Sequence, residues 1–255
     1  GSYNATAVLA EIDKAYVSNA DDAQVTEFLN RSPWAQVAVD NASNLLGGWL
    51  STNIMNAVNA TTYGIMVPRR AAMTVPNKDG LYIGTPNGAG RQSSGTGNAE
   101  CYLNNTTFYA KDASPLAILT FSEIKFIEAE AALRAGNTTR AYAAYEAGIK
   151  ANFTKVGLAA DGTTYFQDPS VGVGATNLTL DLIFKEKYVA LFLNPETWVD
   201  ARRHDYNYKD FKLPANANSN ITGFIRRVAY PSSDITTNGK NVPQVKLDDR
   251  LFWDK

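Results

Sequence analysis

The stretch SEIKFIEAEAALRAGNTTRAYAAYEAGIKANF, residues 122–153, predicts two helices joined by a tight turn. Ser122 is a suitable N-cap for a helix over 123–135, because its hydroxyl can accept a hydrogen bond from a free N–H of the first turn. Gly136-Asn137 stops this helix, and Thr138 or Thr139 can cap a second one. The second helix carries its large apolar side chains on one face, at Tyr142, Tyr145, Ile149 and Phe153. The stretch is therefore predicted to fold as an antiparallel helical hairpin.

Small and aromatic residues of the hairpin recur at a spacing similar to that of a tetratricopeptide repeat. The residues at these positions are Ala129, Ala141, Tyr145 and Gly148. Only one such unit is visible, and one repeat cannot bury its own faces. We therefore expect the hairpin to pack against other helices.

Three further segments have apolar residues at helical spacing: 3–30, 33–60 and Leu178–Leu193. In the first, Asn19–Asp22 breaks the pattern before it resumes at Val25. Within 33–60, Gly47-Gly48 predicts a kink or a close backbone approach. Pro195 ends the last of these helices, since proline cannot continue one. The predicted fold class is mainly α, with a tetratricopeptide-like hairpin, further helices and long irregular loops.

Two regions lack helical spacing. Residues 61–114 are rich in glycine and proline and are predicted to form a loop-rich insertion, with possible short strands at 64–67 and 81–83. The polar segment from Asn207 to Lys255 is expected to wrap the helices. Long loops within a compact domain often carry binding surfaces, so the insertion is the first candidate for a binding surface.

Composition excludes several classes of function. The 24 Lys+Arg residues nearly balance 25 Asp+Glu, so no basic field is available for nucleic acid. One cysteine, Cys101, excludes an internal disulfide, and one histidine, His204, excludes a multi-histidine metal centre. No apolar run approaches the ~18 residues of a spanning helix. We expect neither a metal ion nor a cofactor.

Aromatic residues make up 11% of the chain, and several lie in the insertion among polar side chains. Such rings can stack on the C–H faces of sugars while neighbouring polar groups bind hydroxyls. For any single tyrosine, packing between a loop and a helix is the simpler interpretation. The candidate carbohydrate-binding residues are Tyr82, Asn87, Arg91 and Tyr102, with Trp49 at the edge of the insertion.

The densest cluster of charged residues is 196–204, ETWVDARRH. On a helix, Glu196, Asp200 and Arg203 share a face, and Trp198 lies one turn from Arg202. An acid–base site with His204 is one interpretation, and an ion-pair network around a buried tryptophan is the favoured one. A second catalytic interpretation is a glycoside hydrolase with paired carboxylates, the candidates being Glu123, Glu128, Glu130 and Glu186. Helical glutamates are common, so this alternative is weaker.

Six blocks, taken in order, resemble the SusD/RagB family of outer-membrane nutrient-binding lipoproteins, and more closely its second, SusD-like branch. The blocks are 81–88 (LYIGTPNG), 119–134 (LTFSEIKFIEAEAALR), 145–151 (YEAGIKA), 186–193 (EKYVALFL), 196–203 (ETWVDARR) and 225–233 (IRRVAYPSS). The C-terminal sequence 248–254 (DDRLFWD) is also similar. These blocks are mainly scaffold and supply no fixed binding residues.

The resemblance implies one SusD-like domain over 1–255, the C-terminal portion of a longer protein, with an α–α superhelix fold. It implies a non-enzymatic protein at the surface of the outer membrane, attached only through an N-terminal lipid anchor. Such a protein captures glycans or other nutrients and delivers them to a SusC-type TonB-dependent transporter. A tetratricopeptide-like protein-interaction scaffold stays open as the alternative.

Overall fold

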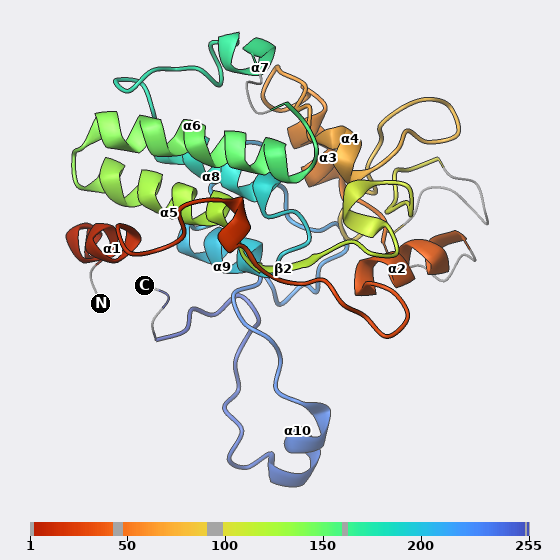
Figure 1. Ribbon diagram of the computed structural model, residues 1–255. Coiled ribbons are helices and arrows are strands. Elements are labelled where there is room, and N and C mark those ends of the chain that lie inside the picture. The colour runs from red at the N-terminus through yellow and green to blue at the C-terminus, as the bar shows by residue number, and fades with distance from the viewer. Residues whose placement is uncertain (1–2, 43–47, 91–98, 160–162, 253, 255) are drawn as a thin grey trace.

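Helices dominate the fold, and the hairpin of α5 and α6 lies in the left half of the view (Figure 1). The structure, a computed structural model, describes residues 3–42, 48–90, 99–159, 163–252 and 254. The α-helices are α1 (Ala5–Ile12), α2 (Pro33–Ala42), α3 (Thr52–Val58), α4 (Arg70–Met73), α5 (Phe121–Arg134), α6 (Thr138–Lys155), α7 (Thr163–Gln167), α8 (Leu180–Ala190), α9 (Glu196–Arg203) and α10 (Ser232–Asn238). Two 3₁₀ turns, η1 (Asn19–Asp21) and η2 (Phe108–Ala110), and two strands, β1 (Ala23–Val25) and β2 (Leu116–Leu119), complete the order.

The predicted hairpin is confirmed, but its caps differ from those expected. Thr120 caps α5 by accepting a 3.2 Å hydrogen bond from the backbone N–H of Glu123. Asn137 caps α6, and its side chain accepts from the N–H of Arg140 at 3.0 Å. Ser122 was predicted as the first cap because it precedes the apolar face. Its hydroxyl instead donates to the Gly148 carbonyl at 2.8 Å and so ties the two helices together.

Small residues bring α5 and α6 into close contact, as the repeat-like spacing predicts. Ala129 and Ala141 are fully buried. A Cβ added to Gly148 would lie 3.1 Å from the ring of Phe126, so the glycine sets the helix separation. Helices α1 and α8 pack against α5, and α8 also contacts α6. The hairpin is therefore buried by neighbouring helices.

The 3–30 segment leaves its first helix at Ile12, before the predicted break at 19–22, and the helix predicted to resume at Val25 does not form. Ser18 and Asp21 form a capping box that starts η1, and β1 follows. β1 pairs with β2 in an antiparallel two-stranded sheet in which Ala23 faces Leu119. Pairing with a distant strand therefore overrides the local helical spacing.

The 33–60 segment divides into α2 and α3 instead of forming one helix. Residues 43–47, including Gly47, lie outside the described residues. A Cβ on Gly48 would lie 2.8 Å from Cγ1 of Val37, which confirms the predicted close approach at this glycine. Trp49 is extended and forms an isolated antiparallel bridge with Tyr102, contrary to the helix expected there.

The 61–114 segment is loop-rich as predicted, with α4 and η2 as its regular elements among the described residues. The predicted strands at 64–67 and 81–83 do not form in this part of the chain. Met66 forms only an isolated bridge with Asn59. The carbonyl of Ile83 accepts a 2.7 Å hydrogen bond from the N–H of Cys101 without extending into a ladder.

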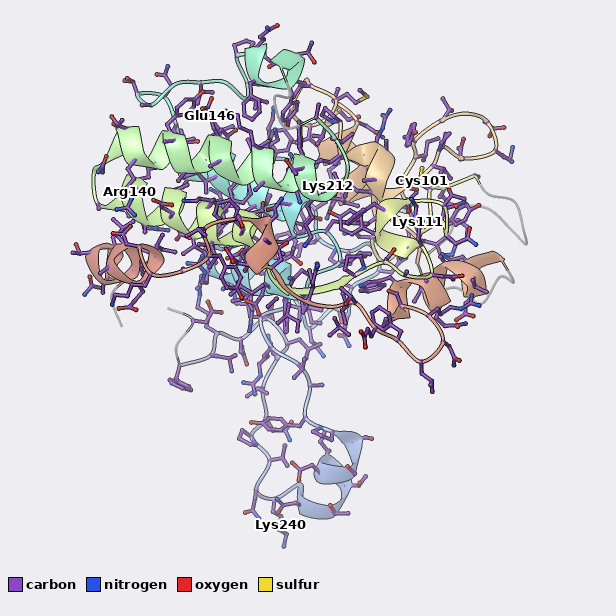
Figure 2. All side chains as sticks on the ribbon, viewed as in Figure 1. Cys101, Lys111, Arg140, Glu146, Lys212 and Lys240 are labelled. Carbon is purple, nitrogen blue, oxygen red and sulfur yellow. The ribbon has the colours of Figure 1, made fainter. Side chains whose placement is uncertain are left out.

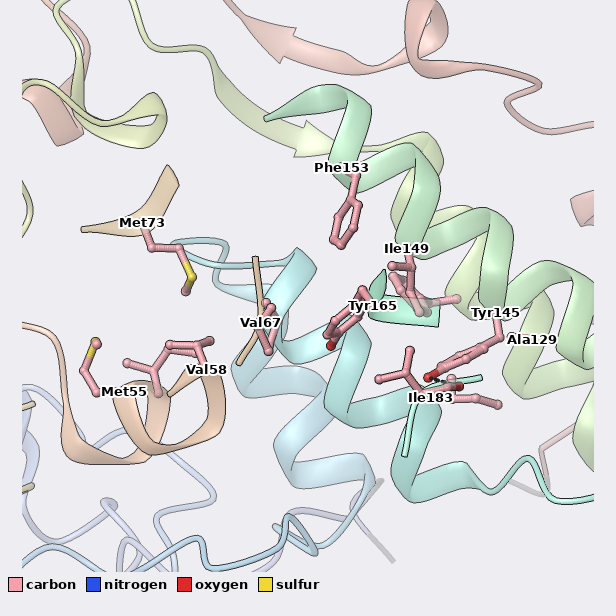
Figure 3. Packing of buried hydrophobic residues seen from close by; sticks show 14 of the residues in the cluster. Met55, Val58, Val67, Met73, Ala129, Tyr145, Ile149, Phe153, Tyr165 and Ile183 are labelled. Carbon is pink, nitrogen blue, oxygen red and sulfur yellow. Dashed lines mark hydrogen bonds between the residues drawn. The ribbon is translucent and has the colours of Figure 1, made fainter. Parts of the chain in front are cut away.

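One continuous core joins the hairpin to the loop-rich half (Figure 3). Phe153 of α6 and Ile183 of α8 face Tyr165 of α7, and all three are almost fully buried. Met55 of α3 and Met73 of α4 extend the same cluster toward the other half. The segments therefore share a core and form one packed unit.

The C-terminal segment only partly wraps the helices. Residues 228–247, called the C-terminal arm below, project away from the body and carry α10, which has no buried residue (Figure 1). Lys240 lies near the far end of this arm (Figure 2). Among the described helices, none combines the length and apolar character needed to cross a bilayer.

Candidate functional site

Three extended segments meet beside α3 and position two of the predicted site residues, Tyr102 within the insertion and Trp49 at its edge. The N–H of Leu50 donates to the carbonyl of Cys101 at 3.1 Å, and the N–H of Thr85 donates to the carbonyl of Leu50 at 2.8 Å. This pairing places Trp49 opposite Tyr102. Their ring centroids lie 5.2 Å apart at an interplanar angle of 49°. The backbone thus holds both half-buried rings in a fixed arrangement.

Trp49 lines a cavity of about 280 Å³. Its lining includes two tryptophans, a tyrosine and a phenylalanine, together with Ser51 and Thr197. The aromatic lining residues are Trp34, Trp49, Tyr188 and Phe192. Ring faces beside a few hydroxyls suit a ligand with an apolar face and a polar rim, as a sugar has. We call this site the aromatic pocket.

Of these four aromatic residues, only Trp49 is a site residue predicted from the sequence. Trp34 and Phe192 lie in the 33–60 and 178–193 segments, whose helical spacing predicts buried helix faces. Both residues are half-buried and line the cavity. Trp34 lies at the start of α2, and Phe192 lies just beyond the end of α8. A large aromatic residue at the end of an apolar helix stripe was the available signal.

Tyr82 lies apart from the described lining of the aromatic pocket. The guanidinium of Arg70 stacks over its ring at 3.6 Å, and the side chain of Asn59 donates to its carbonyl. The ring also packs against the core. These contacts give Tyr82 a structural role, while its part in binding stays a prediction.

Asn87 joins the insertion to the C-terminal segment. Its carbonyl accepts a 2.7 Å hydrogen bond from the N–H of Ala215. A Cβ on the following residue, Gly88, would lie 2.1 Å from the carbonyl oxygen of Ala215, so the two segments are in close contact. Arg91 lies outside the described residues. The structure therefore brings Trp49 and Tyr102 together and leaves the roles of Asn87 and Arg91 as predictions.

The 196–204 block forms an ion-pair network, as the favoured interpretation predicts, but the tryptophan expected to be buried, Trp198, is only partly buried. Asp200 pairs with Lys187 of α8 at 2.6 Å and with Arg203 at 3.0 Å. Arg203 reaches Glu130 of α5 at 2.8 Å, so this network fastens α9 to α5 and α8. Arg202 stacks over Trp198 at 4.2 Å, as the spacing predicts.

His204 stacks on the ring of Phe184, with the ring centroids 4.1 Å apart and the planes 8° from parallel. Burial lowers the pKa of His204, although the carboxylate of Asp181 at 3.2 Å opposes this effect. The imidazole is therefore held in its neutral form against an apolar surface at neutral pH. Its surroundings are those of a packed structural residue.

The carboxylates considered for glycoside hydrolysis are committed to packing. Glu186 is 0% exposed, forms an ion pair with Arg69 and accepts a 2.7 Å hydrogen bond from the hydroxyl of Tyr165. Burial alone would raise its pKa, but Lys185 and Arg69 outweigh this and hold the pKa at about 2. Glu123 is 4% exposed, and burial raises its pKa to about 7. Neither carboxyl group is open to a polysaccharide.

Metal binding was not expected, and the described residues contain no group of three or more His, Cys, Asp or Glu side chains that could hold an ion. The aromatic pocket is therefore the strongest candidate site in the part of the chain that the structure describes.

A family model with the description "Starch-binding associating with outer membrane" matches residues 2–231. The chain belongs to this SusD-like family. The resemblance carried by the six blocks is thereby confirmed, and so is the mainly helical fold class. No curated protein matches the chain in a sequence search.

Solved structures show the same SusD-like fold. A SusD homolog from Bacteroides fragilis has a TM-score of 0.72 and 19% identity, covering 100% of this chain and 62% of that one. A SusD homolog from Bacteroides vulgatus has a TM-score of 0.69 and 21% identity, covering 91% of this chain and 53% of that one. A chitin-binding protein has a TM-score of 0.62 and 20% identity, covering 89% and 52%. The SusD-like chain thus spans little more than half the length of these structures.

Proposed function

We propose that this SusD-like chain binds intact glycans at the surface of the outer membrane and delivers them to a SusC-type TonB-dependent transporter. The observation that carries the proposal is an aromatic-walled cavity of about 280 Å³ in a chain that belongs to a starch-binding, outer-membrane-associated family. As the resemblance implies, the protein is attached to the membrane by an N-terminal lipid anchor.

The aromatic pocket holds a sugar by stacking and by hydrogen bonds. One sugar face lies against the ring of Trp49. Tyr102, the partner of Trp49 in the antiparallel bridge, packs against this ring and supports it. The Ser51 hydroxyl can donate to the sugar, whereas the Thr197 hydroxyl donates to the carbonyl of Asn194 at 2.7 Å and can only accept from the sugar. Because the extended backbone already fixes the rings, little side-chain entropy is lost on binding.

The burial of the two candidate catalytic carboxylates supports binding of the glycan without its hydrolysis. Glu186 has no exposed surface, and its low pKa keeps it ionised, so it cannot act as a general acid near neutral pH. Glu123 is also buried, beside the ion pair of Lys187 and Asp200. These two residues were the best sequence candidates for catalysis.

An oligosaccharide array tests the proposal, followed by recovery of the bound sugar. We would incubate the chain with neutral maltohexaose and chitohexaose, the probes chosen from the family description and from the chitin-binding relative. The expected result is saturable binding of at least one probe, which chromatography then recovers at its original length. Shortened products would indicate a hydrolase, and absence of binding across all neutral glycans of the array would contradict the proposal.

Delivery has its own test. An epitope-tagged protein, solubilised from outer membranes in mild detergent, is expected to co-purify with a TonB-dependent porin. Co-purification of other proteins without any porin would contradict the delivery step and leave glycan capture standing.

A further inference from the structure

A small second cavity, called the side cavity below, lies beside the aromatic pocket. Trp34, Phe192 and Leu193 line both cavities, so the two are neighbours. The volume of the side cavity is about 30 Å³, against about 280 Å³ for the aromatic pocket. The side cavity can therefore take a small substituent of a bound sugar but has no room for a second sugar ring.

Asn194, between α8 and α9, connects the side cavity with a polar group of the aromatic pocket. Its backbone carbonyl accepts the 2.7 Å hydrogen bond from the hydroxyl of Thr197, which lines the aromatic pocket. Asn194 itself lines the side cavity. Because the hydroxyl proton of Thr197 is used in this bond, its oxygen can only accept a hydrogen bond from a ligand. One turn of the chain thus supplies groups to both cavities.

The side-chain amide of Asn194 has an unused donor. Asn194 is 7% exposed, and its Oδ1 accepts a 2.9 Å hydrogen bond from the backbone N–H of Glu196. This bond fixes which end of the amide is the oxygen. The buried Nδ2 has no hydrogen-bond partner among residues 3–42, 48–90, 99–159, 163–252 and 254. A buried donor without a partner is unfavourable, so a ligand oxygen that accepts from Nδ2 would stabilise the complex.

The rest of the described lining favours a neutral group with an apolar end. Pro115, Leu116 and Ala117 supply an apolar wall. Lys155 is the charged residue of this lining, and its ammonium group pairs with the carboxylate of Asp22 at 2.6 Å. Because the charge of Lys155 is already balanced, the side cavity does not require an anion. It suits a small neutral substituent that carries one acceptor and one methyl group.

We propose that the side cavity binds the acetyl group of an N-acetylhexosamine whose ring lies in the aromatic pocket. The inference rests on the proposed function and names the substrate class of that same site. The acetyl oxygen accepts a hydrogen bond from Nδ2 of Asn194, and the methyl group lies against Pro115 and Leu116. The amide N–H of the sugar donates to the hydroxyl oxygen of Thr197. An O-acetyl group lacks this N–H, so the N-acetyl form fits better.

Calorimetric titration of the chain with chitotetraose and with cellotetraose tests the acetyl requirement directly. The two ligands share a β-linked glucose backbone, and in chitotetraose an acetamido group replaces one hydroxyl of each ring. Chitotetraose is expected to bind at least ~10-fold more tightly, because it gains a hydrogen bond to a buried donor and buries a methyl group.

Asn194→Asp keeps the Oδ1 that accepts from Glu196 and replaces the Nδ2 donor with an oxygen. The preference for chitotetraose over cellotetraose is expected to fall below ~3-fold in this variant. Asn218→Asp is the matched control, since exposed Asn218 likewise accepts from the N–H two residues on, at 3.0 Å, and lies outside the described lining of both cavities. The control is expected to keep the preference. If Asn194→Asp fails to fold, as thermal unfolding would reveal, Asn194→Ser decides the result, because its hydroxyl can still accept from Glu196.

Equal affinity of the wild type for the two tetrasaccharides, or a preference that survives both Asn194 variants, overturns the inference. The array of neutral glycans separates this failure from failure of the proposed function. Binding of any neutral glycan without tighter binding of chitotetraose than of cellotetraose overturns the acetyl subsite alone. Absence of binding across the whole array overturns both.

Discussion

Trp49 and Tyr102 face each other across an antiparallel bridge, with their ring centroids 5.2 Å apart. The first ring lines the aromatic pocket, and the second packs against it from the next segment. The carbonyl of Tyr102 also accepts a 2.8 Å hydrogen bond from the hydroxyl of Thr74. This relationship makes the orientation of Trp49 depend on a residue outside the described pocket lining.

Tyr102→Ala is therefore expected to weaken glycan binding by about 3–10-fold, because an aromatic pair contributes about 0.5–1.5 kcal/mol beyond area burial. Tyr102→Phe keeps the ring and is expected to retain the wild-type affinity within about 2-fold. Calorimetric titration of both variants measures this difference. Equal affinities for Tyr102→Ala and the wild type would show that Trp49 keeps its orientation unaided.

Gly148→Ala is expected to destabilise the chain by about 1–3 kcal/mol through overpacking. The new methyl group would lie 3.1 Å from the ring of Phe126, which is fully buried. Urea unfolding measures the loss. In a Phe126→Leu background the same change is expected to be neutral or stabilising, since alanine favours helix by up to about 1 kcal/mol over glycine. An equal loss in both backgrounds would point to a cause other than this contact.

Glu186→Gln is expected to lower the free energy of unfolding by about 3–5 kcal/mol, because it leaves Arg69 and Lys185 buried without their counter-ion. In the wild type, the pKa of Glu186 is about 2, below the ordinary value of 4.5, so the ionised carboxylate stabilises the folded state above pH 4.5. That contribution is lost as the pH falls from 4.5 toward about 2. Denaturant unfolding at several pH values checks both expectations.

Glu146→Gln is the matched control for this substitution, because Glu146 lies on α6 in a more exposed pair with Lys150 at 3.7 Å. It is expected to change stability by less than about 1 kcal/mol. Losses of similar size for the two variants would contradict the assignment of Glu186 as a buried anchor.

Glu123 is expected to impose the opposite pH dependence. Burial first, and then the charges of Asp200 and Glu196, raise its pKa to about 7, although Lys187 opposes them. The folded state therefore binds the proton more tightly, so this contribution is complete below pH 4.5 and is lost as the pH rises toward about 7. Glu123→Gln mimics the protonated form and is expected to stabilise the chain by on the order of 2 kcal/mol at about pH 8. If the free energy of unfolding of Glu123→Gln depended on pH as that of the wild type does, the result would contradict the raised pKa of Glu123.

The helical hairpin could be predicted because its signals are local. Gly136 ends one helix, and small residues recur at fixed spacing along the two helices. The extended conformation of Trp49 could not be predicted in this way, since it depends on pairing with Tyr102, far along the chain. Similarly, β1 forms only because β2 is available as a partner.

Part of the candidate site could be predicted from the sequence. Trp49 and Tyr102 stood out as aromatic residues in or beside a loop-rich segment; Trp49 lines the pocket, and Tyr102 packs against Trp49 from outside the described lining. Tyr188 and Phe192 have the spacing of core residues, and only tertiary packing places them at a cavity wall. That Asp205 and Asp254 pair with Arg226 likewise depends on tertiary packing.

Calorimetric titration of Trp49→Ala with the neutral hexasaccharide that the wild type binds tests the central claim most directly. Phe252→Ala, which removes a highly exposed ring outside the described pocket lining, is the matched control. The expected loss for Trp49→Ala is about 30-fold, the ~2 kcal/mol typical of an aromatic anchor, with wild-type affinity in the control. Unchanged affinity in a folded Trp49→Ala protein would show that the glycan binds elsewhere and would contradict the account.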